Sequence, residues 1–316
     1  MSKILITGGA GFIGTHLCEY FLNQGDEVMC IDNFLSGSRD NIKAFQANSK
    51  FTLIEHDICE PLSELPTGLD AIFHFACPAS PNPASPISYV NHPVETLMVS
   101  TLGTQRMLEL AKANDCQIIF ASTSEVYGDP LVHPQPETYW GNVSPNGPRS
   151  CYDEGKRAME AFAFTYYRLH KTAIKVVRIF NTYGPNMRRD DGRFTINLID
   201  CYLGNKAFPM YGQGTATRSF CYIDDLVEGI VSVYKTDKAI GEVINLGNPT
   251  EYTINEAIKI FENVTGKELI KEQFAELGDD PKKRQPDISK AKKLLGWEPK
   301  IDFKTGMQKT LATYEK

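Results

Sequence analysis

Short apolar runs alternate with longer amphipathic segments through the first half of the chain. A run that is apolar on both faces predicts a buried strand, and a longer amphipathic segment predicts a helix. Strands separated by helices indicate a parallel sheet covered on both faces, which is a doubly wound α/β fold. The predicted strands are residues 4–6, 28–31, 51–54, 71–75, 117–121 and 174–179, and the predicted helices are residues 12–23, 94–112 and 153–170.

The pattern becomes less regular after about residue 181. Further helices are predicted at residues 195–203, 223–234 and 255–264, and a short extended piece at residues 242–246. No repeat, low-complexity tract or flexible linker marks a boundary, so we expect a smaller lobe that is interleaved with the last strands of the first. The expected division is a first domain over residues 1–180, with returning segments near 219–248, and a second lobe over residues 181–218 and 249–316.

Residues 78–86 interrupt the pattern with four prolines in nine positions. Proline removes a backbone donor and fixes φ, so this segment is predicted to be a loop. A rigid surface connection would account for it. The loop also follows a predicted strand directly, and ligands of open α/β sheets bind at that edge. A place beside a ligand is therefore the second interpretation.

The composition is that of a globular chain: 316 residues, 42% hydrophobic and 23% charged, with a net charge of -6. This charge argues against a nucleic-acid polymer or an anionic membrane surface as partner. The eight cysteines are scattered without a CxxC pair, so we expect free thiols in a reducing compartment and no metal site. The sequence begins without a charged leader and has no membrane-length apolar run, from which we expect a cytoplasmic protein.

A glycine-rich turn follows the first predicted strand and opens the first predicted helix. Gly8, Gly11 and Gly14 would permit a tight turn, close approach to a pyrophosphate and close packing of helix on strand, as in a Rossmann dinucleotide site. Asp32 ends the second strand, where a carboxylate accepts hydrogen bonds from the adenosine ribose. Its charge would repel a 2′-phosphate, so NAD is favoured over NADP, although Arg39 is nearby.

A second group of residues supplies chemistry. Tyr152 and Lys156 are four positions apart and would share one face of a helix. A nearby ammonium and a positive nicotinamide would lower the pKa of the phenol, so that Tyr152 accepts a proton while hydride leaves the adjacent carbon. Thr123 ends a strand at the same edge. Glu125 is not needed for hydride transfer; it suits an enzyme that moves a second proton, or else it is a salt-bridge residue.

Several longer segments are more specific than these motifs, and through them the chain resembles the extended short-chain dehydrogenase/reductases that act on nucleotide sugars. It closely resembles the UDP-glucuronate decarboxylase (UDP-xylose synthase) family within them. The resemblance covers nearly the whole chain, and the segments that carry it are residues 122–130, 139–141, 147–149, 151–157, 178–185, 191–193 and 279–288.

The resemblance implies a carboxy-lyase that uses tightly bound NAD to oxidise C4 of UDP-glucuronate, release carbon dioxide and re-reduce the product to UDP-xylose. It also implies a homodimer joined through the helices at residues 94–112 and 153–170. The implied catalytic residues are Thr123, Glu125, Tyr152, Lys156 and Arg284. The residues expected at the cofactor are Gly8, Gly11, Phe12, Ile13, Gly14, Asp32, Asn33, Asp57, Ile58, Phe75, Ala76, Ser122, Tyr152 and Lys156. Those expected at the substrate are Pro78, Ser124, Asn181, Arg193, Tyr211, Gln213, Arg218 and Arg284.

Two departures and three alternatives qualify this interpretation. The loop at residues 78–86 is several residues longer than the family's usual connection, and Ser100 stands where the family commonly has Asn. A nucleotide-sugar 4,6-dehydratase would typically carry Asp-Glu where this chain has Ser124-Glu125, and a 4-epimerase usually lacks the acid. A binding-only NAD sensor would be expected to lose Tyr152 or Lys156.

Overall fold

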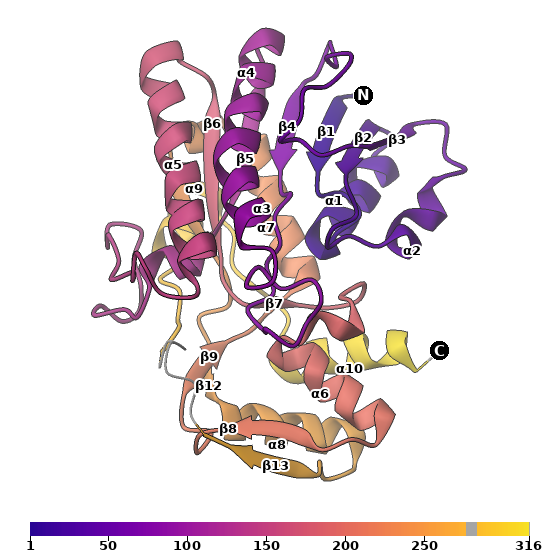
Figure 1. Ribbon diagram of the computed structural model, residues 1–316, viewed down its shortest axis with the longest axis vertical. Helices are drawn as coiled ribbons and strands as arrows, with labels where there is room; N and C mark the ends of the chain where they lie inside the picture. The colour runs from indigo at the N-terminus through magenta and orange to yellow at the C-terminus, as the bar shows by residue number, and fades with distance from the viewer. Residues whose placement is uncertain (276–282, 316) are drawn as a thin grey trace.

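A seven-stranded parallel sheet forms the centre of the computed structural model, which describes residues 1–275 and 283–315 (Figure 1). Neighbouring strands pair in parallel in the order β11-β6-β5-β4-β1-β2-β3, which is a doubly wound arrangement and confirms the predicted fold class. The strands are β1 (Lys3–Thr7), β2 (Glu27–Asp32), β3 (Phe51–Glu55), β4 (Ala71–His74), β5 (Gln117–Thr123), β6 (Ile174–Ile179) and β11 (Val243–Leu246).

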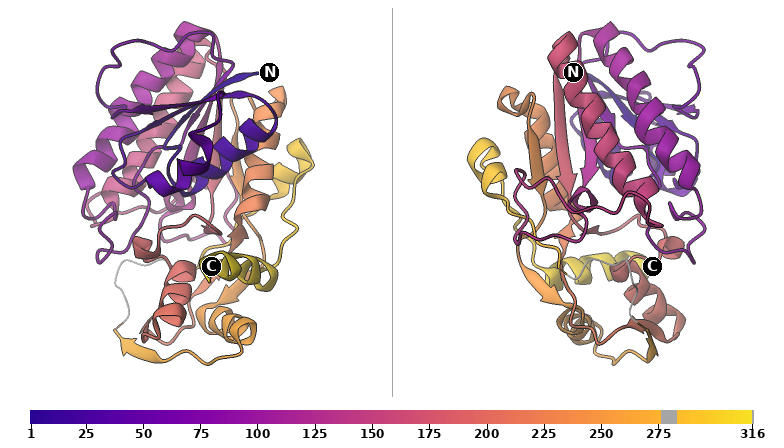
Figure 2. Two further views of the ribbon diagram at one scale, coloured as in Figure 1. Left: turned by 90° about the vertical axis from the view of Figure 1, so that its right-hand side faces the viewer. Right: turned by 60° about the vertical axis from the view of Figure 1, so that its left-hand side comes forward.

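The sheet is sandwiched between two layers of helices (Figure 2). Successive side chains of a strand point to opposite faces. In β1, Ile4 and Ile6 therefore join the core that contains Phe21 of α1 (Phe12–Asn23) and Ile230 of α7 (Ile223–Lys235). Leu5 joins the opposite core, which α4 (Thr104–Asn114) and α5 (Ser150–His170) cover. Both faces of the sheet are buried, which explains why its strands are apolar throughout.

The single helix predicted over residues 94–112 is interrupted. The chain forms α3 (Pro93–Met98), then a turn of π-helix, η2 (Val99–Gly103), and then α4. The π turn packs closely against α5, because a Cβ at Gly155 would lie 3.2 Å from the side chain of Ser100. Hydrophobic periodicity does not reveal one wide turn inside a helical segment, so the sequence predicted the helix without its interruption.

The smaller lobe lies beyond the carboxyl ends of the central strands (Figure 1). Its helices are α6 (Phe194–Gly204), α8 (Ile254–Thr265) and α10 (Phe303–Tyr314). Its two-stranded sheets pair β8 (Phe208–Tyr211) with β13 (Lys271–Phe274), and β9 (Thr217–Ser219) with β12 (Glu251–Thr253). The remaining elements are α2 (Arg39–Ile42), η1 (Lys43–Phe45), η3 (Ser124–Tyr127), β7 (Thr182–Tyr183), η4 (Arg189–Asp191), β10 (Cys221–Tyr222), η5 (Asp237–Ala239) and α9 (Ser289–Leu295).

Three further properties bear on function. Across residues 1–275 and 283–315, no helix has the length and apolar character required to cross a bilayer. The same residues contain no group of three or more His, Cys, Asp or Glu side chains arranged to hold a metal ion. All eight cysteines are free thiols.

Candidate active site

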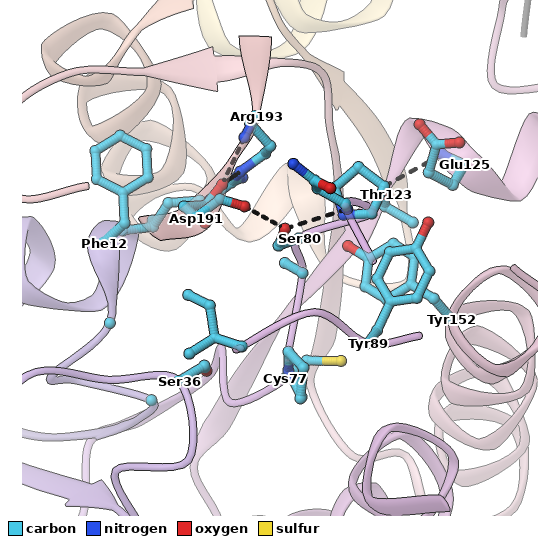
Figure 3. A pocket seen from close by; sticks show the side chains of 18 of the residues that line it. Phe12, Ser36, Cys77, Ser80, Tyr89, Thr123, Glu125, Tyr152, Asp191 and Arg193 are labelled. Atoms are coloured by element: carbon cyan, nitrogen blue, oxygen red, sulfur yellow. Dashed lines mark hydrogen bonds and ion pairs between the residues drawn. The ribbon is translucent and has the colours of Figure 1, made fainter. Parts of the chain in front are cut away.

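A cavity of about 980 Å³ lies between the carboxyl edge of the sheet and the smaller lobe (Figure 3). All the residues predicted at the cofactor and all those predicted to be catalytic line it. So do the predicted substrate residues Pro78, Ser124, Asn181, Arg193, Tyr211, Arg218 and Arg284. The structure therefore brings together, in one cavity, side chains that are distributed from the first strand to the C-terminal part of the chain.

Gln213 is the exception among the predicted residues. It does not line the cavity, and its carbonyl oxygen accepts a hydrogen bond from Nδ2 of Asn255 at 2.9 Å. Gly212 and Gly214 both have positive φ and turn the chain toward α8 at this point. The glycines around Gln213 thus belong to a turn of the smaller lobe, and the assignment of Gln213 to the substrate stays a prediction.

The turn from β1 to α1 fits a dinucleotide. Gly8 has a φ of +72°, and a Cβ there would lie 2.8 Å from the backbone of Ala76. The amide of Gly11 donates to the Gly8 carbonyl oxygen at 3.0 Å, and a Cβ at Gly14 would overlap that same oxygen. These glycines leave the first turn of α1 open to the cavity, where backbone amides and the positive end of the helix dipole suit a pyrophosphate.

Asp32 is the last residue of β2 and lies beside this turn. Its carboxylate is buried and accepts hydrogen bonds from the amides of Ala10 at 2.9 Å and Phe34 at 2.8 Å. Burial raises the pKa of Asp32, and these hydrogen bonds oppose the rise. Arg39 forms an ion pair with Glu55 at 2.6 Å, and its guanidinium lies over the Phe34 ring. The Arg39 guanidinium is thus already paired with the carboxylate of Glu55, and the carboxylate of Asp32 is suited to bind the ribose hydroxyls of NAD.

Three of the predicted catalytic residues meet at the end of β5 and the start of α5. The Thr123 hydroxyl lies beside the Tyr152 phenol and acts to lower its pKa. The Thr123 hydroxyl also accepts a hydrogen bond from the amide of Glu125 at 3.2 Å (Figure 3). Lys156 lies one turn further along α5, with Nζ 5.8 Å from the centre of the Tyr152 ring and donating to the carbonyl oxygen of Ala121 at 2.9 Å.

The expected lowering of the Tyr152 pKa is not what these residues produce. Burial is the largest influence and raises the pKa of the phenol above its ordinary value, and the nearby Cys77 and Glu125 act in the same direction. The neighbouring Thr123 hydroxyl and the positive charge of Arg193 oppose them without reversing the result. The sequence argument considered the neighbouring ammonium and the nicotinamide but did not include desolvation of the ring.

Glu125 lies inside a cluster of guanidinium groups. Its Oε2 forms ion pairs with Nη2 of Arg149 at 2.5 Å and with Nη2 of Arg284 at 3.0 Å. Burial raises the pKa of Glu125, but the charges of Arg284, Arg149 and Arg218 outweigh it and leave the pKa below its ordinary value. Arg284 is itself only 1% exposed and also donates to the carbonyl oxygen of Ser124 at 2.7 Å.

The remaining predicted residues already have partners within the protein. Ser122 donates to Glu160, which is paired with Arg178. Arg193 pairs with Asp191 at the start of α6, as Figure 3 shows, and Arg218 on β9 donates to the carbonyl oxygen of Thr217 at 2.8 Å. Tyr211 is half-exposed and packs against Phe274. Residues 279–282 of the segment that ends at Ile288 lie outside the described residues.

The loop at residues 78–86 is irregular, as predicted, and lines the cavity. Ser80 on this loop donates to the backbone oxygen of Asp191 at 2.5 Å, which joins the loop to the smaller lobe. Ser100 is buried outside the cavity wall, with its hydroxyl 3.8 Å from Sγ of Cys77. The longer loop at residues 78–86 thus borders the site directly. Ser100 does not line the cavity, but it contacts Cys77, which does.

Sequence reasoning missed two residues of the site. Arg149 belongs to a segment that carries the family resemblance, but no role was assigned to it, although it precedes Tyr152 by one helical turn. Tyr89 lies in an irregular stretch after the proline loop, and its ring stacks on that of Tyr152 with 4.7 Å between centroids. A cationic residue just before a Tyr-x-x-x-Lys helix was the available signal for Arg149; no pattern marked Tyr89.

Comparison with known proteins shows the family of the chain. The family model described as GDP-mannose 4,6 dehydratase matches residues 5–310. "UDP-glucuronic acid decarboxylase 6" of Arabidopsis thaliana is 49% identical, with 96% of this chain and 86% of the relative covered. "UDP-glucuronic acid decarboxylase 1" of Danio rerio is 44% identical, over 99% of this chain and 73% of the relative.

Solved structures of other enzymes that act on nucleotide sugars are similar to this chain over nearly its whole length. UDP-glucuronic acid 4-epimerase from Bacillus cereus, in complex with UDP-glucuronic acid and NAD, has a TM-score of 0.85, 30% identity and 99% coverage of both chains. A dTDP-glucose 4,6-dehydratase from Streptomyces venezuelae, with NAD bound, has a TM-score of 0.88 and 26% identity over 99% of this chain and 97% of its own. The chain therefore belongs to the GDP-mannose 4,6 dehydratase family of extended short-chain dehydrogenase/reductases and, within it, to the group of the UDP-glucuronic acid decarboxylases.

Proposed function

We propose that this enzyme is an NAD-dependent UDP-glucuronate decarboxylase that forms UDP-xylose and carbon dioxide. One observation carries the proposal. The Tyr152 and Lys156 pair of a sugar oxidoreductase opens onto the same cavity as Glu125, whose carboxylate is held between Arg149 and Arg284. Oxidation of a hydroxyl needs only Tyr152 and Lys156. The buried guanidiniums of Arg149 and Arg284 are suited to bind a carboxylate, which a decarboxylase must recognise and remove.

The cofactor site described above fits NAD, which when bound accepts hydride from C4 of the sugar and returns it at the end of the cycle. In our proposal Tyr152 removes the proton from the C4 hydroxyl, and Thr123 holds the phenol toward that oxygen. Lys156 supplies positive charge near the ring, which favours the phenolate. Because burial raises the pKa of Tyr152, its phenolate depends on this added positive charge, and the phenol formed when Tyr152 accepts the C4 proton returns that proton at the end of the cycle.

The carboxylate is lost from a 4-ketone. The bond between C5 and the carboxylate breaks, its electrons pass to the ketone, and carbon dioxide leaves. Arg284 either binds the carboxylate before this step or donates a proton to C5 after it. Burial lowers the pKa of Arg284, and the neighbouring Arg218 and Arg149 add to this effect while Glu125 opposes it, so its guanidinium is a stronger acid than usual. Glu125, as an anion, keeps Arg149 and Arg284 oriented toward the sugar.

The nucleotide end of the substrate is assigned to the smaller lobe. We propose that Asn181 and Arg218 hold the diphosphate of UDP and that Tyr211 lies near the nucleoside, because all three line the cavity on that side of the sheet edge. The expected division of the chain, with residues 1–180 and 219–248 on the cofactor side and residues 181–218 and 249–316 on the nucleotide-sugar side, follows the same arrangement.

We further propose that the enzyme is a cytoplasmic homodimer. In support of the dimer, α3 leaves the apolar side chain of Leu97 40% exposed next to α5. The exposed Val94 and Met98 of the same helix also border the cavity. Free, scattered cysteines support a reducing compartment.

Incubation of the purified protein with UDP-glucuronate tests the reaction. We expect carbon dioxide and UDP-xylose in equal amounts, without net accumulation of NADH, and no product from a Tyr152→Phe variant that still binds NAD. Formation of UDP-galacturonate without carbon dioxide would instead indicate an epimerase. Unchanged UDP-glucuronate together with turnover of a nucleotide glucose would indicate a dehydratase, and either result would overturn the proposal.

A further inference from the structure

Tyr89 contributes a phenol to the active-site cavity that the proposed chemistry does not use. Its ring lies parallel to that of Tyr152, with an interplanar angle of 7° and 4.7 Å between centroids. The side chain is 1% exposed and lines the cavity on the side of Glu125, as Figure 3 shows. The residue is therefore in place beside the reacting part of the sugar.

The loop before Tyr89 holds it rigidly. The amide of Tyr89 donates to the carbonyl oxygen of Ser80 at 3.1 Å, and the Ser88 hydroxyl donates to the same oxygen at 2.9 Å. Ser80 and Ser88 also form an isolated parallel bridge. These contacts join the two ends of the proline-rich loop. Backbone contacts therefore hold Tyr89 in position without a ligand.

The hydroxyl of Tyr89 is buried, and among the described residues it has no hydrogen-bond partner. A buried polar group without a partner costs about 1–3 kcal/mol, and tyrosine hydroxyls in protein interiors usually have one. Phenylalanine would give the same ring stacking on Tyr152 without this cost. An unsatisfied donor in the wall of a substrate cavity points to an acceptor on the ligand.

The surroundings indicate which acceptor this is. Burial is the largest influence on Tyr89 and raises its pKa, so the phenol is protonated and a donor at neutral pH. The charged groups that act on it are Arg149, which lowers its pKa, and Glu125 and Asp153, which raise it. Glu125 is already paired with the guanidiniums of Arg149 and Arg284. The guanidiniums of Arg149, Arg284 and Arg218 act on Glu125, and together they outnumber the carboxylates of Glu125 and Asp153. The cluster therefore keeps a positive charge, and an anionic oxygen suits this position better than a sugar hydroxyl.

We propose that the Tyr89 hydroxyl donates a hydrogen bond to the carboxylate of the uronic acid and, with Arg149, selects acidic over neutral nucleotide sugars. This inference rests on the proposed function and adds a specificity-determining residue to it. The contact is made to the group that leaves, so it is present with UDP-glucuronate and absent with UDP-xylose, which lacks the carboxylate.

The pair of ligands gives a direct test by titration calorimetry. Binding is measured in a Tyr152→Phe background, so that UDP-glucuronate is not consumed, with and without Tyr89→Phe. A hydrogen bond to a charged group predicts that UDP-glucuronate binds about 10- to 100-fold more weakly after Tyr89→Phe. UDP-xylose should bind with unchanged affinity, because the ring and its stacking are retained. The affinity ratio of the two ligands isolates the carboxylate contact from any general effect on folding.

Tyr139→Phe is the matched control. This hydroxyl accepts a hydrogen bond from the amide of Leu131 outside the cavity, and its removal should leave the ratio unchanged. Equal weakening of both ligands by Tyr89→Phe, or no weakening of UDP-glucuronate, overturns the inference. Release of carbon dioxide by the unmodified enzyme is measured separately. If it occurs and the ratio does not change, the role of Tyr89 alone is wrong; if it does not occur, the proposed function fails first.

Discussion

Glu125 is surrounded by more positive charge than it can neutralise. Two guanidiniums contact one of its oxygens, at 2.5 Å and 3.0 Å, and a third, that of Arg218, contributes to the lowering of its pKa. The chain as a whole carries a net charge of -6. The surroundings of Glu125 therefore have the opposite sign to the molecule as a whole, which favours binding of an anionic sugar at this part of the cavity.

The lowered pKa of Glu125 predicts a pH-dependent contribution to stability. Glu125→Gln should lower the free energy of unfolding by about 3 kcal/mol at pH 7, because it leaves buried guanidiniums without their counter-charge. A carboxyl whose folded-state pKa is lowered stabilises fully above its ordinary pKa of 4.5 and loses that effect as pH falls through the lowered value. Urea unfolding of both proteins should give equal differences at pH 7 and pH 5.5 and a smaller one at pH 3.5.

Glu154→Gln is the comparison for that experiment. Glu154 pairs with Arg157 on the surface of α5, and its side chain is 37% exposed, so its replacement should change stability by less than about 1 kcal/mol. A Glu125→Gln difference that is as small as this, or that stays constant down to pH 3.5, would contradict an ionised, tightly paired Glu125.

Single residues also show where sequence reasoning reaches its limit. Tyr152 and Lys156 were placed together because helix geometry fixes the relation of positions four apart. Arg149 was not assigned to Glu125, although only 24 positions separate them, because both lie where regular structure begins or ends. Tyr89 follows an irregular loop, and no period in the sequence states where such a side chain points.

Among the elements, the turn from β1 to α1 was predicted in detail. Each of its glycines is required by a steric contact within a few residues or with the adjacent strand end, so local sequence contains most of the information. The π turn inside the helix predicted at residues 94–112 is different. It depends on close packing of Ser100 against Gly155, which belongs to another helix, and such a contact has no signature at either position alone.

The glycine turn gives a prediction about the cofactor. Gly14→Ala would place a Cβ against the Gly8 carbonyl oxygen and push α1 away from the turn. The purified variant should carry little or no NAD, measured by chromatography after release from denatured protein, and should regain little activity when NAD is added. Gly204→Ala at the end of α6 is the control, because its Cβ would meet only the flexible side chain of Lys206. Normal NAD content in Gly14→Ala would contradict the assigned role of this turn.

At the scale of the whole molecule, the exposed apolar side chains of α3 support a dimer. Leu97→Glu should place a charge in that interface and shift the molar mass measured by light scattering from dimer to monomer at micromolar concentration. Ile270→Glu changes an equally apolar, exposed side chain on the smaller lobe and should leave the mass unchanged. A monomeric unmodified protein, or a Leu97→Glu variant that remains a dimer, would remove α3 from the interface.

The fold class could be predicted because strands that are apolar on both faces alternate with helices over the first 180 residues. The smaller lobe was harder. Its helices α6 and α8 were predicted, whereas α10 was not. The pairing of β8 with β13 and of β9 with β12 joins segments far apart in the chain, and only three-dimensional packing determines it.

Arg284 contacts Glu125 across 159 positions of sequence. During translation the glycine turn, Tyr152 and Lys156 are therefore synthesised long before Arg284. The partly made chain already contains what binds a dinucleotide, but it lacks the residue that we assign to the acid sugar. A chain that ended between Lys156 and Arg284 would therefore contain the residues of the candidate cofactor site without the complete candidate site for decarboxylation.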